Sequence, residues 1–159
     1  MKVTGDWLTA DSTQAVFAAL QADGHSAFAV GGCVRNALMS VPVTDVDIAT
    51  DATPETVQSL AQAAGLKSVP TGIDHGTITV VSGGTGYEVT TFRADTETDG
   101  RHAVVRFSKD MAEDAARRDF TMNALYADAA GQVVDPLGGL PDLKARHVRF
   151  IGTAQDRIA

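Results

Sequence analysis

Two aspartates stand one residue apart in the stretch Val43-Thr44-Asp45-Val46-Asp47-Ile48-Ala49-Thr50. In an extended strand, the side chains of residues i and i+2 point to the same face of the sheet. A strand over residues 43–49 would therefore direct Asp45 and Asp47 toward one point and turn Val46 and Ile48 into a core. Two carboxylates on a rigid strand suit Mg²⁺, which takes its remaining ligands from water and substrate phosphates.

A glycine pair and an arginine precede these aspartates in Val30-Gly31-Gly32-Cys33-Val34-Arg35. Residues 27–30 are typical of a short buried strand, so Gly31 and Gly32 are expected at a strand-to-helix turn, where backbone amides can cradle phosphates. Arg35 lies about one turn into that helix, from which its charge can reach a triphosphate. Taken alone, the glycines favour an ordinary turn and Arg35 a surface salt bridge. The paired acids that follow favour the phosphate site, although the ending of a Walker loop is missing.

Glu88 lies in an expected strand over residues 87–92. An adjacent antiparallel strand would bring it beside the two aspartates as a third carboxylate. It could then polarise an attacking hydroxyl or complete the ligands of a metal ion. A solvated glutamate on an exposed strand face is an equal alternative.

The other dense polar segment is Arg117-Arg118-Asp119-Phe120-Thr121-Met122-Asn123. Two adjacent arginines suit phosphate binding. Asp119 and Asn123 are four residues apart and share one helix face, where they can bond each other or a ribose hydroxyl. Asp119 can equally cap the helix, which would leave Asn123 a structural role.

The composition narrows the class of protein. The chain has 159 residues, which fits one domain or one piece of a larger protein. Its net charge of −7 argues against a protein that coats nucleic acid, so any contact is expected to be limited to a nucleic-acid end. The single cysteine, Cys33, fits a reducing cytoplasm and a buried packing role. The sequence contains no apolar run of membrane-spanning length, and its first six residues lack the apolar core of a signal peptide.

The sequence predicts a mixture of helices and strands. Helices are expected over residues 11–23, 33–39, 53–64 and 109–117, and strands over residues 27–30, 43–49, 77–81, 87–92, 126–128, 133–135 and 147–151. A glycine-rich hairpin joins residues 77–81 to 87–92, and the polar residues 93–106 are expected to form a mobile loop. Residues 155–159 read as the start of another helix, which suggests that the natural protein continues. The mixture indicates an α+β or α/β protein and not a doubly wound dinucleotide fold.

Together these segments resemble the catalytic head of the class II tRNA nucleotidyltransferases and bacterial poly(A) polymerases, within the polymerase β superfamily. The resemblance rests on five stretches in the family's order and spacing, at residues 31–35, 45–50, 88–93, 117–124 and 135–139. It implies an α+β fold whose mixed, mostly antiparallel sheet is flanked by helices on one side. It also implies one catalytic head over residues 1–159, with the neck, body and tail domains absent from this chain.

The resemblance further implies an enzyme that transfers a nucleoside monophosphate from ATP or CTP to the 3′-hydroxyl of an RNA, with tRNA as the expected acceptor. Asp45 and Asp47 would hold two Mg²⁺ ions, and Glu88 would be the third catalytic carboxylate. The nucleotide-binding residues that the resemblance implies are Gly31, Gly32, Arg35, Arg117, Arg118, Asp119 and Asn123. Residues 93–106 would be the family's flexible nucleotide-positioning loop.

Two departures from the family pattern affect this interpretation. The family usually has an aspartate after the arginine of the glycine turn, where this chain has Asn36. The family's motif for choosing between ATP and CTP lies beyond the segments present. Poly(A) polymerase therefore remains an alternative to CCA addition. So do a non-catalytic nucleotide- or RNA-binding module of the same fold and a small-substrate nucleotidyltransferase, although the 117–123 segment fits the tRNA and poly(A) group better.

Overall fold

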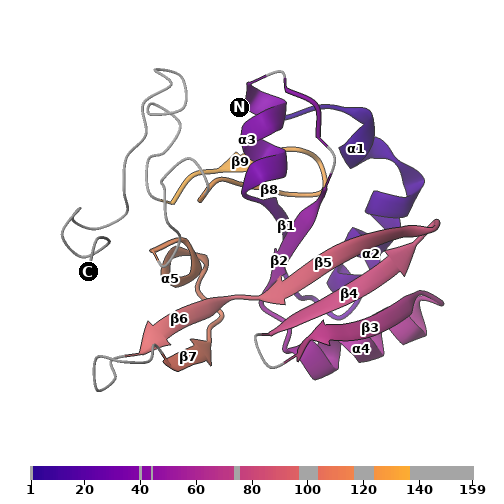
Figure 1. Ribbon diagram of the computed structural model, residues 1–159, viewed down its shortest axis with the longest axis vertical. Helices are drawn as coiled ribbons and strands as arrows, with labels where there is room; N and C mark the ends of the chain where they lie inside the picture. The colour runs from indigo at the N-terminus through magenta and orange to yellow at the C-terminus, as the bar shows by residue number, and fades with distance from the viewer. Residues whose placement is uncertain are drawn as a thin grey trace.

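The computed structural model describes residues 2–39, 41–43, 45–73, 76–96, 104–116 and 124–136. Seven of the described strands form one sheet in the order β3-β4-β5-β2-β1-β8-β9 (Figure 1). These strands are β1 (Ala27–Val30), β2 (Asp47–Thr50), β3 (Lys67–Gly72), β4 (Thr77–Ser82), β5 (Thr85–Thr91), β8 (Tyr126–Ala127) and β9 (Val133–Val134). β2 pairs with β5 in parallel, and the other neighbours pair antiparallel. The expected mixed, mostly antiparallel sheet is confirmed.

Five helices accompany the sheet in the part of the chain that the structure describes. They are α1 (Asp6–Thr9), α2 (Asp11–Gln21), α3 (Gly32–Leu38), α4 (Pro54–Ala63) and α5 (Met111–Ala116). α4 begins as its sequence predicts, because the Thr53 side chain accepts a hydrogen bond from the Thr56 backbone N–H and Pro54 occupies the first turn. None of the described helices has the length and apolar character needed to cross a membrane.

The two faces of the sheet are covered differently. Alternate residues of the central strands, such as Ala29 and Ile48, are fully buried in the main core with side chains from α2 and α4. Figure 1 shows both helices on this one face. Their neighbours in sequence, Val30 and Ala49, belong to a second cluster on the opposite face.

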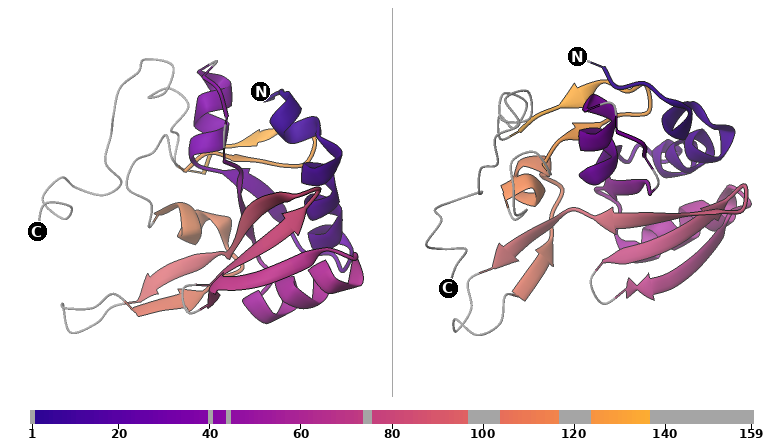
Figure 2. Two further views of the ribbon diagram at one scale, coloured as in Figure 1. Left: turned by 45° about the vertical axis from the view of Figure 1, so that its right-hand side comes forward. Right: turned by 45° about the horizontal axis from the view of Figure 1, so that its top comes forward.

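The second cluster brings α5 to the opposite face, so the helices do not all lie on one side as expected. Tyr126 donates a hydrogen bond from its hydroxyl to Oδ2 of Asp114 at 2.6 Å. The backbone N–H of Arg93 donates to Oδ1 of the same carboxylate at 3.0 Å, and Asp114 is only 1% exposed. These bonds tie α5 to β8 and to the start of β6 (Arg93–Thr96), which pairs with β7 (Val104–Phe107). Figure 2 shows this hairpin leading away from the end of β5.

Three other expectations differ from the structure. Residues 93–106 were expected to be a mobile loop, but residues 93–96 and 104–107 pair as β6 and β7, and only the intervening residues lie outside the described part. The helix α1 and the strand β3 were not expected. The sequence of β3 does not predict a strand, because it contains Pro70 and Gly72, and both residue types are rare in strands. Proline is tolerated here because β3 lies at the edge of the sheet.

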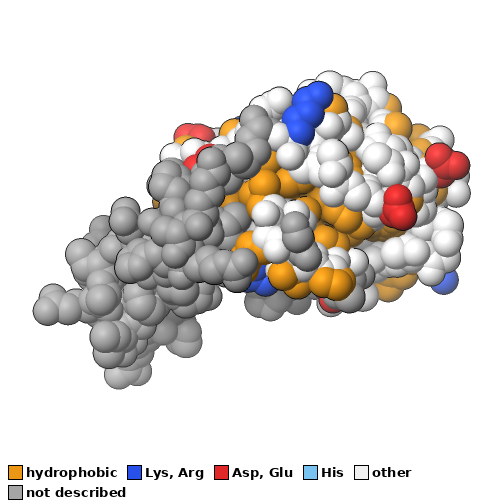
Figure 3. Space-filling view, turned by 90° about the horizontal axis from the view of Figure 1, so that it is seen from above, with side chains coloured by type: hydrophobic (Ala, Val, Ile, Leu, Met, Phe, Trp, Pro, Cys, Tyr) orange, Lys and Arg blue, Asp and Glu red, His pale blue; other side chains and the backbone are white. Residues whose placement is uncertain are grey.

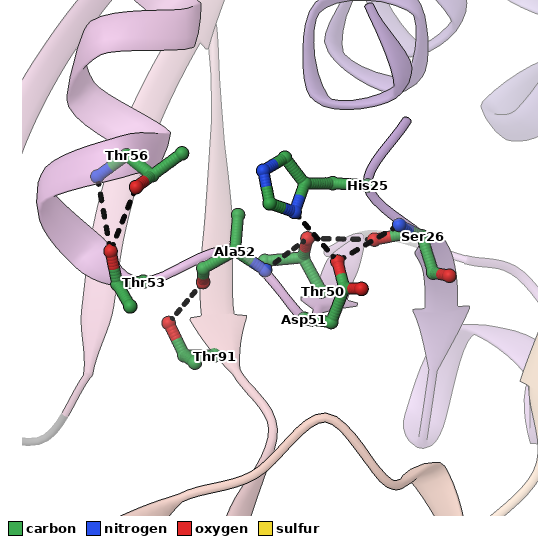
Figure 4. Close-up of polar contacts among 8 residues, drawn as sticks. All are labelled: His25, Ser26, Thr50, Asp51, Ala52, Thr53, Thr56 and Thr91. Carbon is green, nitrogen blue, oxygen red and sulfur yellow. Dashed lines mark hydrogen bonds and ion pairs between the residues drawn. The ribbon is translucent and has the colours of Figure 1, made fainter. Parts of the chain in front are cut away.

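The end of β2 is held by a network of side-chain hydrogen bonds, shown in Figure 4. Thr50 donates its hydroxyl to the Ser26 carbonyl at 2.7 Å and accepts from the Ala52 backbone N–H at 3.2 Å. Asp51 accepts from the Ser26 backbone N–H at 2.9 Å, and its carboxylate lies 3.1 Å from Nδ1 of His25. These contacts fix the end of β2 against the start of β1, and so help to fix the register of β2.

We expect Thr50→Val to lower the free energy of unfolding by about 2 kcal/mol, because the side chain keeps its shape while the Ser26 carbonyl and the Ala52 N–H lose a partner in a buried place. Urea denaturation followed by circular dichroism measures this change. Thr85→Val, at an exposed position at the start of β5, is the matched control and should leave stability nearly unchanged. Equal stability of the Thr50 and Thr85 variants would contradict the role given to this network.

Candidate active site

The first residue of β2 places one carboxylate on the open face of the sheet. Asp47 is exposed, whereas the next residue, Ile48, is 0% exposed in the main core. In the parallel pairing of β2 with β5, Asp47 lies opposite Glu88 and Ile48 lies opposite Val89. Because partners in register share a face, Asp47 and Glu88 both point away from α2 and α4.

Asp45 reaches the same site by a route that differs from the expected one. The strand begins at Asp47 and not at Val43, so Asp45 lies in the segment that enters β2 and the alternation of a strand does not orient it. Even so, Asp45, Asp47 and Glu88 line one hollow of about 380 Å³. Val46 packs only partly against the main core. The expected juxtaposition of three carboxylates is confirmed, but Glu88 arrives through a parallel pairing and not an antiparallel one.

The hollow is also lined by two residues that were not predicted to belong to the site. Thr79 of β4 lies opposite Glu88 in the antiparallel pairing of β4 with β5, and Gly86 precedes Glu88 by two residues on the same face. The alternation of Ile78 and Val80 predicts that Thr79 faces outward. Its position opposite Glu88, however, depends on the register between β4 and β5, for which the sequence carries no local signal.

The glycine turn lies between β1 and α3, as the sequence predicts. Gly31 has φ 76° and ψ −129°, a backbone conformation that residues with a side chain rarely adopt. Its N–H donates to the Leu125 carbonyl at 3.2 Å, so this amide supports the fold and is not directed at a phosphate. A Cβ on Gly32 would lie 3.5 Å from Nη2 of Arg35, which shows that the guanidinium folds back over the turn.

Asn36 connects this turn to the segment that carries Asp45. Its Oδ1 accepts a hydrogen bond from Nε of Arg35 at 3.3 Å. Its Nδ2 donates to the Pro42 carbonyl, also at 3.3 Å. An aspartate at this position would keep the first bond and lose the second, because a carboxylate carries no N–H. The amide therefore makes a hydrogen bond with Arg35, without the charge that a carboxylate would bring.

Cys33 packs behind Asp47, at the start of α3. Its side chain is buried, as expected, and its thiol donates to the Val30 carbonyl at 3.4 Å. Burial raises the pKa of this thiol from 9.0 to about 11, and the nearby charge of Asp47 adds to the increase. The backbone N–H of Asp47 opposes the increase by stabilising the thiolate. The thiol therefore stays protonated at neutral pH and supports the site without reacting in it.

The remaining predicted nucleotide-binding residues, Arg117, Arg118, Asp119 and Asn123, lie outside the described residues. The structure therefore brings together the three carboxylates and places Gly31, Gly32 and Arg35 at the end of the neighbouring strand β1.

The carboxylates suit a divalent ion that binds together with a substrate. Within the described residues, no three His, Cys, Asp and Glu side chains are placed so that they alone could hold a metal ion. Asp45 and Asp47 nevertheless offer two exposed carboxylates in an open hollow. Mg²⁺ is usually held by one or two carboxylates, with water and substrate phosphates as its other ligands, so this donor set fits it.

The chain is similar to known proteins in sequence and in fold. Residues 27–149 match the poly A polymerase head domain family. The chain is 46% identical over 145 residues to a CCA-adding enzyme of Oceanobacillus iheyensis, an alignment that covers 90% of this chain and 35% of that protein. It is similar in structure to the Bacillus stearothermophilus CCA-adding enzyme in complex with CTP, with a TM-score of 0.81, 40% identity, and coverage of 92% of this chain and 34% of the other.

A second solved structure is a tRNA nucleotidyltransferase complexed with a primer tRNA and an incoming ATP analog. It gives a TM-score of 0.67 at 30% identity, over 86% of this chain and 39% of the other. The chain thus spans 35% of the length of the curated relative and 34% and 39% of these two structures.

We expect Cys33 to react with iodoacetamide at pH 8 at least about 100-fold more slowly in the folded protein than in urea, because only the thiolate reacts and burial suppresses its formation. Mass spectrometry of the labelled fraction over time measures both rates. Similar rates in the folded protein and in urea would show that the Cys33 thiol is not buried behind Asp47.

Proposed function

Because the chain belongs to the poly A polymerase head domain family, we propose that it forms the catalytic head of a template-independent RNA nucleotidyltransferase. This enzyme adds nucleoside monophosphates from CTP and ATP to the 3′-hydroxyl of a tRNA. The observation that carries the proposal is the hollow in which Asp45, Asp47 and Glu88 meet, beside a turn that bears Arg35. The CCA-adding relatives support tRNA as the acceptor.

The three carboxylates of the hollow have two roles in the proposed reaction. Asp45 and Asp47 would hold the divalent ions with their carboxylates. The chemistry expected of two Mg²⁺ ions held there is activation of the attacking hydroxyl and neutralisation of charge on the departing pyrophosphate. Glu88, one strand away, orients the attacking 3′-hydroxyl by accepting a hydrogen bond from it.

The nucleotide's triphosphate lies on the β1 side of the carboxylates. Gly32 has no side chain, so a phosphate can approach the backbone of the turn. The Arg35 guanidinium, which lies over Gly32, can pair with phosphate oxygens. Asn36 holds the guanidinium from one side through its bond to Nε. Arg117, Arg118, Asp119 and Asn123 complete the nucleotide site in this proposal, by contacts to the ribose and phosphates.

The charge of the chain limits how it meets RNA. Figure 3 shows a face on which basic side chains are sparse among hydrophobic and uncharged polar ones. The whole chain has 13 Lys and Arg against 20 Asp and Glu. Broad contact with a phosphate backbone needs a basic surface, so this chain is suited to hold the end of the RNA and not its length.

Polyadenylation is a second candidate function, favoured by the family description that residues 27–149 match. A poly(A) polymerase would use the same carboxylates and the same turn. The two activities differ in their products: CCA addition stops after a short fixed sequence that contains C, whereas polyadenylation gives a ladder of A alone.

The test uses the polypeptide that contains these residues, with Mg²⁺, labelled CTP and ATP, and a tRNA trimmed of its 3′ end. We expect the wild type to extend the tRNA, and Asp45→Asn or Asp47→Asn to lower the rate about 1,000-fold or more, because loss of a metal ligand removes several kcal/mol of transition-state stabilisation. Gel electrophoresis of the products gives both the rate and the sequence added.

Asp23→Asn is the matched control, since Asp23 is an exposed aspartate in the turn after α2 and does not line the hollow. It removes the same charge and should leave the rate unchanged. Extension by the Asp45 and Asp47 variants at the wild-type rate would contradict the catalytic assignment. A wild type that adds no nucleotide would instead favour a binding module of the same fold.

We expect Arg35→Ala to raise KM for CTP and ATP by about tenfold or more with a smaller change in kcat, because Arg35 contacts phosphates before the reaction as well as during it. Steady-state kinetics at saturating tRNA separates the two constants. Arg35→Lys keeps the charge but not the planar guanidinium, so its KM should lie between those of the wild type and Arg35→Ala. A fall in kcat with unchanged KM would place Arg35 in the chemical step.

A further inference from the structure

Thr79 belongs to the same row of side chains as the carboxylates. In the registers of three neighbouring strands, Thr79 of β4 lies opposite Glu88 of β5, which lies opposite Asp47 of β2. Neighbouring strands lie about 4.8 Å apart, so these side chains stand next to one another on the open face. Ile78 and Val80, on either side of Thr79, are 0% and 1% exposed on the other face.

The end of the hollow at Thr79 is polar and carries no charge. The Thr79 hydroxyl lies 2.7 Å from that of Thr71, which fixes its orientation. A hydroxyl offers one donor and two acceptor sites, so Thr79 keeps bonding capacity after this contact. Gly86 forms the floor beside it, because a Cβ there would lie 3.4 Å from Cγ2 of Thr79. A larger residue at position 86 would project into the space that Thr79 lines.

The order of the strands places Thr79 and the glycine turn on opposite sides of β2. The turn with Gly32 and Arg35 follows β1, on one side of β2, whereas β5 and β4 lie on the other side. In phosphoryl transfer the attacking and leaving oxygens are roughly in line on opposite sides of the phosphorus. If the triphosphate lies over the turn, the terminal nucleotide of the acceptor lies over β5 and β4.

We propose that the Thr79 hydroxyl binds the 2′-hydroxyl of the acceptor's terminal ribose, so that this end of the hollow distinguishes an RNA end from a DNA end. The proposal rests on the function proposed above. Glu88 meets the attacking 3′-hydroxyl, and the 2′-hydroxyl is attached to the adjacent carbon of the same ring. Thr79 lies beside Glu88 and one strand farther from Asp47, so its hydroxyl is placed to bond the group next to the one that Glu88 binds. A 2′-hydroxyl, which both donates and accepts, is the group by which proteins tell RNA from DNA.

The test compares two acceptors that differ in one atom, a trimmed tRNA ending in a ribose and the same tRNA ending in a 2′-deoxyribose. We expect Thr79→Val to lower kcat/KM about tenfold for the ribose end and to leave the deoxyribose end unchanged, because the variant removes one hydrogen bond and keeps the shape. Thr79→Ser keeps the hydroxyl and should retain the preference. Thermal denaturation checks that all variants are folded.

Thr90→Val is the matched control. Thr90 lies on the same open face, and its hydroxyl pairs with that of Thr77 at 2.9 Å, but it does not line the hollow. This variant should leave kcat/KM unchanged for both acceptors. Gly86→Ala is a second variant of the hollow itself: its methyl group narrows the space beside Thr79 and should raise KM for the tRNA.

The outcomes separate the two proposals. A wild type that extends both acceptors equally well, or a Thr79→Val variant that loses the same factor on both, would overturn the role of Thr79 and leave the nucleotidyltransferase function standing. A wild type that extends neither acceptor would overturn the proposed function and this inference together. A loss confined to the ribose end supports Thr79 as a residue that selects RNA.

Discussion

The register of β2 between β1 and β5 is the constraint on which the candidate site depends. Side chains alternate along a strand, so a shift of one residue would turn Ile48 to the open face and Asp47 into the core. The burial of Ile48 opposes such a shift, and so does the network of Thr50 and Asp51 at the far end of the strand. The same packing that stabilises the domain therefore sets the position of the Asp47 carboxylate, to which we assign a catalytic role.

Features of the site that depend on neighbours in sequence could be predicted from the sequence. The glycine turn after β1, the outward side of Asp47 and the hairpin of β4 and β5 all follow from local patterns. The start of β2 was predicted four residues too early, because a side-chain contact, the hydrogen bond from Asn36 to the Pro42 carbonyl, holds the chain that enters the strand. The pairing of Asp47 with Glu88 and of Glu88 with Thr79 is a property of register between distant strands, for which a single sequence carries no signal.

Support for the site comes from residues that do not enter the hollow. Cys33 fills the space behind Asp47, and Asn36 links the Arg35 guanidinium to the chain before Asp45. The glycine turn and the segment that leads to Asp45 and Asp47 are thus linked through Asn36. The hydrogen bond from Nε of Arg35 to Asn36 helps to keep the guanidinium over Gly32.

The most direct test of the central claim is anomalous X-ray diffraction from crystals grown with Mn²⁺ and a non-hydrolysable CTP analogue. We predict a manganese peak between the carboxylates of Asp45 and Asp47, with the triphosphate extending toward Gly32 and Arg35. A nucleotide bound elsewhere on the chain, or manganese held away from both aspartates, would contradict the assignment of this hollow as the site of nucleotidyl transfer.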